Sequence, residues 1–242
     1  MACTCANRRR SALYQAGSSS KGTAFAARHA ECVFVGGNSQ SKMAADVAKL
    51  RALAAEAGRD RSQLLVFALV TVITAATDAE AEARFADYKQ YASSSGALAL
   101  MGGWTGIDFS KPELINATAA TSNAIEGAAA AFTAGGSSAH QDVESIGRAV
   151  ALGGGGPVLV GGPQRIADQL EAWAEMADLD GFNLAYAVMP ETFVDVVEHL
   201  VPELQRRGLF HMDYEGPTLR ENMGLPIPRA ADWHAARRKA AE

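Results

Sequence analysis

Short apolar runs alternate with helical patterns along most of this chain, and this alternation limits the fold more than any other feature. Strand-like runs lie at 12–16, 32–37, 64–74 and 181–186, and helical patterns lie at 22–31, 41–58, 78–92, 141–152, 164–177 and 191–200. Strands that alternate with helices form parallel sheets, because a parallel neighbour needs a crossover connection. We therefore expect an α/β protein built on a parallel sheet.

The helical segments each show an apolar stripe at helical spacing. The residues that we expect to point inward are, for 41–58, Met43, Val47, Leu50 and Ala54; for 164–177, Ile166, Leu170, Trp173 and Ala177; and for 191–200, Phe193, Val197 and Leu200. Gly58 is well placed to end the first of these helices. Pro202 predicts a short final turn rather than a smooth continuation of the last helix.

About four strands can be counted, and the number restricts the architecture. A (β/α)8 barrel needs eight strands and about 250 residues without insertions. The 242 residues here contain about four strand–helix units and a long stretch, 93–140, with Ser/Gly clusters at both ends and an Ala-rich middle. We interpret that stretch as an insertion with short helices. The pattern predicts half of a TIM barrel, with an open doubly wound sheet as the alternative.

Composition excludes several classes of protein. The formal net charge of -5 argues against a nucleic-acid-binding surface, and Arg8, Arg9 and Arg10 are interpreted as a solvated extension. The longest apolar run, 64–76, is too short for a membrane helix, and the first residues lack the apolar stretch of a secretory signal. Three cysteines without framework spacing favour a reducing compartment, so we expect a cytoplasmic protein without a metal site.

The stretch "AGSSSKG" follows the first strand and opens a helix. Gly17 permits a tight turn, Ser18 and Ser19 offer hydroxyls, and the first N–H groups of a helix have no intrahelical acceptor. Such a loop can cradle a phosphate, although the P-loop spacing is absent. The alternative is a polar loop whose serine merely caps the helix.

Other candidate positions are weaker. Gly161 and Gly162, before Pro163, also form either a phosphate-binding loop or a simple turn. The histidines show no metal-binding pair, and only His140, at the end of the insertion, is a candidate for the mouth of a barrel. Most acidic residues fall on predicted helix faces. Asp180 is the exception, because it lies just before a predicted strand.

Five segments together resemble a known family. They are "YQAGSSSKGTAFAARHAECVF", "GGWTGIDFS", "VLVGGPQRIADQLEAWAE", "DLDGFNLAY" and "LVPELQRRGLFHMDYEGPTLRENMGL", in this order from about residue 13 to 225. The chain resembles the flavin-dependent monooxygenases of the bacterial-luciferase-like superfamily, in the branch of nitrilotriacetate monooxygenase, pristinamycin synthase and dibenzothiophene-sulfone monooxygenase. The last segment is the most distinctive.

The resemblance implies a TIM barrel that binds reduced FMN supplied by a separate flavin reductase. Such enzymes activate O2 and insert one oxygen atom into a small organic substrate. The resemblance assigns the FMN phosphate to Gly17, Ser18 and Ser19. It also places the insertion with Trp104 and Asp108 over the barrel mouth, so that they and His140 are expected in the substrate pocket.

The chain departs from the family in length. Family members run to over 400 residues and carry the "QAGSS" motif near the middle, whereas here it begins at Gln15. The missing amino-terminal half supplies most isoalloxazine contacts and the candidate catalytic histidine and tyrosine, so no catalytic residue is assigned. We expect an unrelated or disordered extension at 1–12, a half barrel with its insertion at 13–208 and a carboxyl-terminal extension at 209–242.

Three interpretations of the function stay open. The first is the carboxyl-terminal part of a reduced-FMN-dependent monooxygenase, incomplete as given. The second is a non-catalytic remnant or interaction protein that needs a partner chain, either a complementary barrel half or a second copy in a homo-oligomer. The third is a deazaflavin-dependent oxidoreductase, since the same superfamily contains such enzymes.

Overall fold

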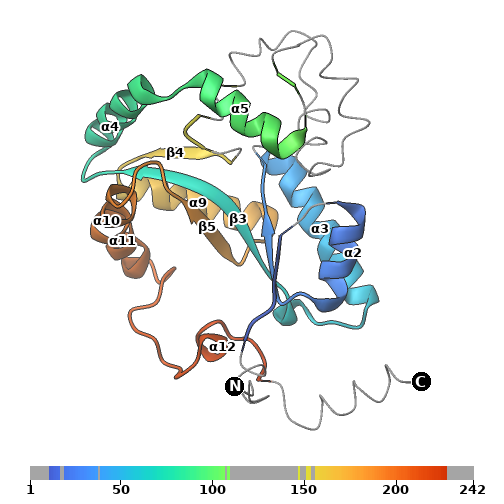
Figure 1. The fold of residues 1–242 in the computed structure, drawn as a ribbon. Helices are drawn as coiled ribbons and strands as arrows, with labels where there is room; N and C mark the ends of the chain where they lie inside the picture. The colour runs from blue at the N-terminus through green and yellow to red at the C-terminus, as the bar shows by residue number, and fades with distance from the viewer. Residues whose placement is uncertain are drawn as a thin grey trace, which may run out of the picture.

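Among the described residues of the computed structural model, five strands are separated from one another by helices along the chain (Figure 1). The structure describes residues 11–16, 19–37, 39–106, 108–109, 147, 151–153 and 156–227. The strands are β1 (Tyr14–Ala16), β2 (Cys32–Val35), β3 (Leu65–Thr74), β4 (Val158–Gly161) and β5 (Gly181–Ala185). Four of them match the predicted runs, and β4 is a short addition at a stretch that the sequence marks only as apolar.

All strand pairs are parallel, and β3 is the strand that joins most of them. β1 pairs with β2, and β2 pairs with residues 65–68 of β3. β5 pairs with residues 67–71, and β4 pairs with residues 71–74. At ten residues, β3 is long enough to hold three partners.

Backbone hydrogen bonds show which edge of β3 each partner occupies. The N–H groups of Leu65 and Thr71 donate to Glu31 and Pro157, the residues just before β2 and β4. The carbonyl of Val66 accepts instead from Asp180, just before β5. Successive residues of a strand point these groups to opposite edges. β2 and β4 therefore share one edge of β3, and the remaining order, β1-β2-β3-β5, is that of four consecutive barrel strands.

The first four described α-helices begin at side-chain caps. The helices are α2 (Ser20–His29), α3 (Gln40–Glu56), α4 (Asp78–Tyr91), α5 (Ser94–Thr105), α9 (Pro163–Ala177), α10 (Glu191–Asp195), α11 (Val201–Arg206) and α12 (Leu219–Asn222). Ser19, Ser39, Thr77 and Ser93 cap the first four through their hydroxyl oxygens. Gly58, with a φ of 74°, follows α3 as predicted.

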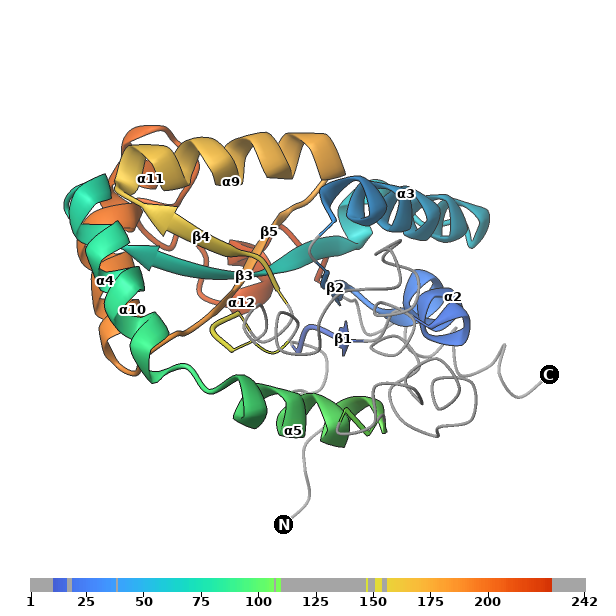
Figure 2. The same cartoon turned by 90° about the horizontal axis from the view of Figure 1, so that it is seen from above.

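The main core lies between the sheet and the helices on one of its faces (Figure 2). The predicted stripes of α3 and α9 are all buried, with Val47 and Ile166 at 0% exposure. They pack against alternate residues of β3, namely Val66, Ala68, Val70 and Val72. A doubly wound sheet carries helices on both faces. The consecutive strand order and the helices on one face therefore confirm the half barrel.

The prediction for the segment 191–200 was wrong about two residues. Phe193 is 37% exposed and Val197 is 64% exposed, whereas Thr192, Val196 and Leu200 are buried. The reason is a widened turn (Val196–Leu200) with i to i+5 hydrogen bonding, which shifts the buried face. The helical path also continues through Pro202 to the end of α11, so Pro202 does not end it, although the turn before it is irregular.

The segment after α11 returns to the start of the sheet, where α12 lies below β1 (Figure 1). Arg220 of α12 is 3% exposed and donates to both carboxylate oxygens of Glu31 and to the carbonyl of Pro226. Glu31 in turn accepts from the N–H of Leu13. This set of contacts fixes α12 to the amino end of β1. Within the described residues, no helix is long and apolar enough to cross a membrane.

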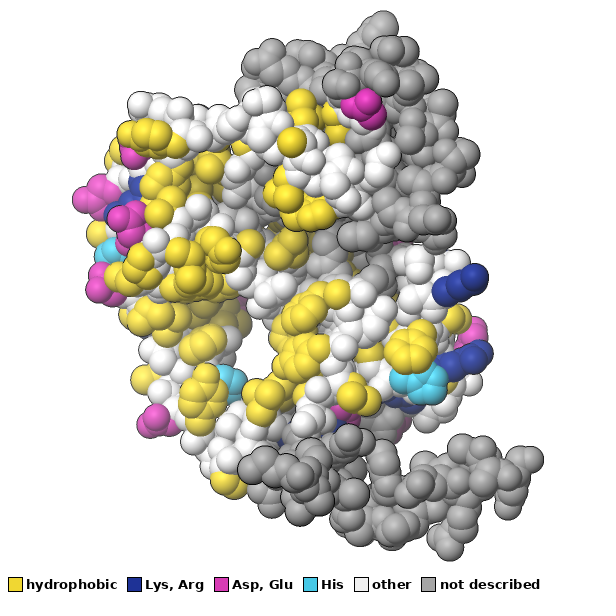
Figure 3. Space-filling view, in the orientation of Figure 1, with side chains coloured by type: hydrophobic (Ala, Val, Ile, Leu, Met, Phe, Trp, Pro, Cys, Tyr) yellow, Lys and Arg dark blue, Asp and Glu magenta, His cyan; other side chains and the backbone are white. Residues whose placement is uncertain are grey.

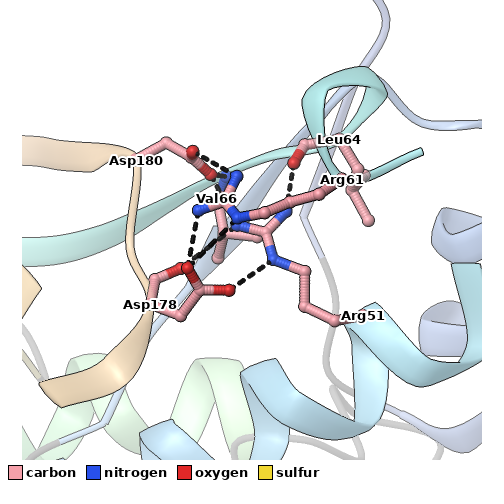
Figure 4. Close-up of polar contacts among 6 residues, drawn as sticks. All are labelled: Arg51, Arg61, Leu64, Val66, Asp178 and Asp180. Atoms are coloured by element: carbon pink, nitrogen blue, oxygen red, sulfur yellow. Dashed lines mark hydrogen bonds and ion pairs between the residues drawn. The ribbon is translucent and has the colours of Figure 1, made fainter. Parts of the chain in front are cut away.

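Two arginines and two aspartates join the amino ends of β3 and β5 (Figure 4). Arg51 donates to Asp178, Asp180 and the carbonyl of Leu64, and Arg61 donates to both aspartates. Asp180 also accepts from the N–H of Val66 at 2.7 Å. Burial opposes ionisation of Asp178, but the hydrogen bonds from Arg61 and the charge of Arg51 outweigh it and lower its pKa. The cluster lies at the end of the barrel associated with stability.

We expect Asp180→Asn to lower the free energy of unfolding by about 2 kcal/mol, because it removes the charge that two arginines and a backbone N–H share. Urea unfolding at neutral pH measures the loss. The matched control, Asp46→Asn, breaks only an exposed pair with Lys42 and is expected to cost less than about 0.5 kcal/mol. Equal losses in the two variants would contradict this role of Asp180.

Glu203 gives the fold a pH-dependent contact. Hydrogen bonds from Arg206 and Arg207 lower the pKa of Glu203 to about 2 from an ordinary value of 4.5. Arg207 also reaches Asp168 and Glu171, so the carboxylate of Glu203 helps to hold α11 against α9. Because the pKa is lower in the folded chain, the stabilisation is complete above about pH 4.5 and is lost as the pH falls toward 2.

Glu203→Gln is therefore expected to flatten the decline of unfolding free energy between pH 4.5 and pH 2. Chemical denaturation at several pH values measures the slope. Glu198→Gln, at an exposed position one turn earlier, is the control and is expected to keep the wild-type slope. A variant at Glu203 with that same slope would show that the carboxylate does not contribute.

Candidate functional site

The carboxyl ends of the strands are where a barrel of this kind places its site. The predicted phosphate loop follows β1, directly at that end of the sheet. Of its three residues, Gly17 and Ser18 lie outside the described residues, and Ser19 is the N-cap of α2. Its Oγ accepts from the N–H of Gly22 at 3.1 Å, and its carbonyl accepts from the N–H and hydroxyl of Thr23. The capping role that the sequence left open is therefore present.

Capping by Ser19 satisfies only some of the N–H groups at the amino terminus of α2. The N–H groups of Ser20 and Lys21 precede those that Ser19 satisfies, and they point out of the helix end as in any α-helix. The first turn contains no acidic residue, and both side chains are exposed. The positive end of the helix dipole is thus not neutralised by a carboxylate of its own first turn. Such an end can accept an anion.

The next strand ends in a similar way. Gly36 and Gly37 follow β2, and Gly37 has a φ of 123°, which favours glycine. A Cβ at either glycine would meet no atom within 4 Å, so the backbone here borders open space. Ser39 then caps α3, whose first turn also lacks an acidic residue. The adjacent strands β1 and β2 therefore both lead into serine-capped helices.

The glycine loop after β4 is different. The N–H of Gly162 donates to Oδ1 of Asp78 at 2.6 Å. A Cβ on Gly161 would lie 3.0 Å from that same carboxylate oxygen. Asp78, in the first turn of α4, thus occupies the position that an anion would take at this loop. Of the two loops predicted as phosphate sites, this loop already donates the N–H of Gly162 to an acceptor within the protein, the carboxylate of Asp78.

An aromatic pair at the end of β5 was missed by the sequence reasoning. Tyr186 is 57% exposed, and its ring centroid lies 6.1 Å from that of Phe193, at the start of α10. Thr192 fixes the turn between them, since its Oγ1 accepts from the N–H groups of Ala187 and Val188. No local motif marks this pair, because the buried face of the helix differs from the predicted one.

Of the three residues expected in the substrate pocket, the structure describes two. Trp104 lies on the last turn of α5 and is 39% exposed. Asp108 is exposed and follows Gly106, which ends α5 in the left-handed conformation with a φ of 69°. His140 lies outside the described residues. Figure 1 shows α5 on the side of the sheet where β2 ends.

Comparison with known protein families shows where this fold belongs. A family model described as luciferase-like monooxygenase matches residues 5–179. The chain belongs to this family. The match covers the predicted phosphate loop, all but one of the strands and the insertion, so the resemblance found in the five segments is confirmed for most of the chain.

Individual relatives agree with the family assignment. The chain is 40% identical over 226 residues to a dimethyl-sulfide monooxygenase of Hyphomicrobium sulfonivorans, covering 93% of this chain and 47% of that protein. It is 39% identical over 228 residues to a long-chain alkane monooxygenase of Geobacillus thermodenitrificans (strain NG80-2), covering 93% and 48%. The chain thus spans about half the length of the curated relatives it matches.

Solved structures of the family share the fold. A riboflavin lyase, RcaE, solved with modified FMN and the substrate riboflavin, has a TM-score of 0.78 at 31% identity, covering 89% of this chain and 47% of that chain. The crystal structure of DmoA from Hyphomicrobium sulfonivorans has a TM-score of 0.73 at 38% identity, covering 90% and 46%. These matches place the chain on half of a luciferase-like barrel.

Asp78 gives a test of the internally satisfied loop. Asp78→Ala leaves the N–H of Gly162 without its acceptor, and we expect a loss of about 1–2 kcal/mol in unfolding free energy by urea denaturation. Asp78→Asn keeps an acceptor oxygen at the same position and is expected to lose less than Asp78→Ala. Equal stability of wild type and Asp78→Ala would refute the importance of this contact.

Proposed function

We propose that this chain is the carboxyl-terminal part of a reduced-FMN-dependent monooxygenase that inserts one oxygen atom of O2 into a small organic substrate. Membership of the luciferase-like monooxygenase family supports the reaction class. The monooxygenases among its relatives and the modified FMN in the RcaE structure support the cofactor. The observation that carries the proposal is the serine-capped amino terminus of α2 at the carboxyl end of β1.

The residues at the start of α2 fit the phosphate of FMN better than those at the glycine loop after β4. Gly17, Ser18 and Ser19 form the proposed phosphate loop, and the N–H groups of Ser20 and Lys21 add donors beside it. An anion at this position meets donors and the positive end of a helix dipole. At Gly162 an anion would meet the carboxylate of Asp78, which repels it. The proposed site is therefore the loop after β1 rather than the loop after β4.

The chain's other residues are assigned to binding and to water exclusion. When bound, reduced FMN supplies the electrons that activate O2. Trp104, Asp108 and His140 belong to the proposed substrate pocket. Tyr186 and Phe193 present aromatic surface at the carboxyl end of β5, and apolar walls of this kind exclude water from a reaction centre. A flavin reductase is the proposed source of reduced FMN.

The proposed activity belongs to the complete barrel. The chain spans about half of its relatives, so the residues that contact the rest of the flavin come from the other barrel half in this proposal. On its own, this chain is expected to recognise the phosphate rather than to turn over substrate. The family's cofactor binding therefore separates into a phosphate part, which this chain supplies in the proposal, and a ring part, which comes mostly from the other barrel half.

A charge placed at the tip of α2 tests the phosphate site. Ser20→Asp is expected to weaken FMN binding by about tenfold, because an added carboxylate repels the phosphate, and to leave the weaker binding of riboflavin unchanged. Flavin fluorescence titrations of the full chain measure both. The helix dipole favours an acidic residue in this turn, so the unfolding midpoint should stay equal or rise, which separates repulsion from misfolding.

Gln40→Asp is the matched control, because it adds the same charge at the first residue of α3. It is expected to leave FMN binding close to that of wild type. Equal affinity of the wild-type chain for FMN and riboflavin would contradict a phosphate site. So would an absence of FMN binding at high protein concentration, or a loss of binding in Gln40→Asp as large as in Ser20→Asp.

A further inference from the structure

The two outer strands of the sheet leave backbone groups directed away from it. Within the described residues, β1 pairs only with β2, and β5 pairs only with β3. The carbonyl of Leu13 accepts from Cys32, so the backbone groups of Tyr14 and Ala16 point to the outer edge of β1. In the register of β5 with β3, the backbone groups of Gly181, Asn183 and Ala185 bond to β3. The N–H groups of Phe182 and Leu184 therefore point to the outer edge of β5.

Both outer strands run in the direction that a closed barrel requires. All described strands are parallel, and β1, β2, β3 and β5 are consecutive neighbours. A barrel of eight parallel strands needs four more between the outer edge of β5 and the outer edge of β1. A parallel sheet with two open edges is a template for added strands, and closure into a barrel removes both edges at once.

The sheet face turned away from α2, α3 and α9 is apolar. Tyr14, Phe34 and Phe67 form a row across β1, β2 and β3, with ring centroids 5.5 Å and 6.2 Å apart. Because register partners in a parallel sheet share a face, this row lies opposite the core residues Val33 and Val66. Tyr14 is 46% exposed, so part of the row faces solvent.

Further apolar side chains surround this face. Figure 3 shows a hollow near the middle of the molecule with apolar side chains on several sides of it. The large apolar residues that are exposed beside β1, after β5 and after α11 are Leu13, Tyr186, Met189, Leu209, Phe210, Met212 and Tyr214. Exposed apolar surface on this scale marks an interaction site. The surface made by these residues, the aromatic row and the two strand edges is called the open face below.

We propose that the open face binds, in trans, an amino-terminal half barrel of the luciferase-like family, with its strands added in parallel to β5 and to β1. This inference rests on the proposed function, because it names the partner that completes the proposed barrel. The relatives favour this occupant over a second copy of the chain. They are similar over 93% of this chain and continue for about as many residues outside the match, and the family model covers β1.

Co-expression of the full chain with the amino-terminal half of the dimethyl-sulfide monooxygenase of Hyphomicrobium sulfonivorans tests the proposal without flavin. We expect a one-to-one complex by light scattering. In that complex, hydrogen exchange at the outward N–H groups of β1 and β5, those of Tyr14, Ala16, Phe182 and Leu184, is expected to be slower than in the chain alone. Because no flavin is present, this result is independent of whether the chain binds FMN.

A proline at position 16 isolates the strand edge. Ala16→Pro removes an N–H that faces outward, so the pairing of β1 with β2 is kept, as for proline on natural edge strands. We expect about tenfold less complex and an unchanged unfolding midpoint for the chain alone. Ala16→Ser keeps the N–H and is the matched control, with recovery of the complex close to that of wild type. The exchange measurement decides the question even if the proline variant does not fold.

Three results would overturn the proposal. The first is the absence of a complex on co-expression. The second is a complex in which the four outward N–H groups exchange as fast as in the chain alone. The third is a dimer of the chain by itself that protects these groups, which would make a second copy the occupant of the open face. Failure of FMN to bind, with the complex intact, would count only against the proposed function.

Discussion

The burial of one face of β3 is the constraint on which the rest of the structure depends. Val66, Ala68, Val70 and Val72 are at most 1% exposed, and they contact helices from both ends of the described chain. Each of these helices has one apolar stripe, so each can cover the sheet from one side only. This arrangement places every strand-to-helix loop at the same end of the sheet, where helix amino termini gather. It also leaves the opposite face of the strands for another set of contacts.

The helix amino termini at that end differ in which group lies next to their positive charge. The loop before α9 receives the carboxylate of Asp78 from α4, and this contact closes it. Among the described residues, the terminus of α2 receives the neutral hydroxyl of Ser19. A hydroxyl satisfies one N–H without supplying charge, so the field of the helix persists beyond the cap. In the proposed function, the side chain of Asp78 thus separates a structural turn from an anion site, although both loops contain glycine at the end of a strand.

Local patterns predicted the elements and the two longest stripes, because apolar spacing alone fixes the buried residues of α3 and α9. They failed where an irregular turn changed the face of the helix, as at Phe193 and Val197. They also could not find the pairing of β4 with the edge used by β2, since four apolar residues do not specify a partner. The contacts of Asp78 and Asp180 join residues 84 and up to 129 positions apart, so spacing along the chain contains no sign of them. For the candidate site, the serine loop was found from sequence and the aromatic pair after β5 was not.

The contact between Arg220 and Glu31 has a consequence for the order of events during synthesis. The two residues are 189 positions apart, so this ion pair closes a loop that contains most of the chain. Closing such a loop carries a large entropic cost, and contacts of this range form after local ones. While the chain emerges from the ribosome, β1 can pair with β2, and β2 with β3, long before Arg220 exists. The first strand therefore waits for nearly the whole chain before Arg220 and Glu31 fix its amino end.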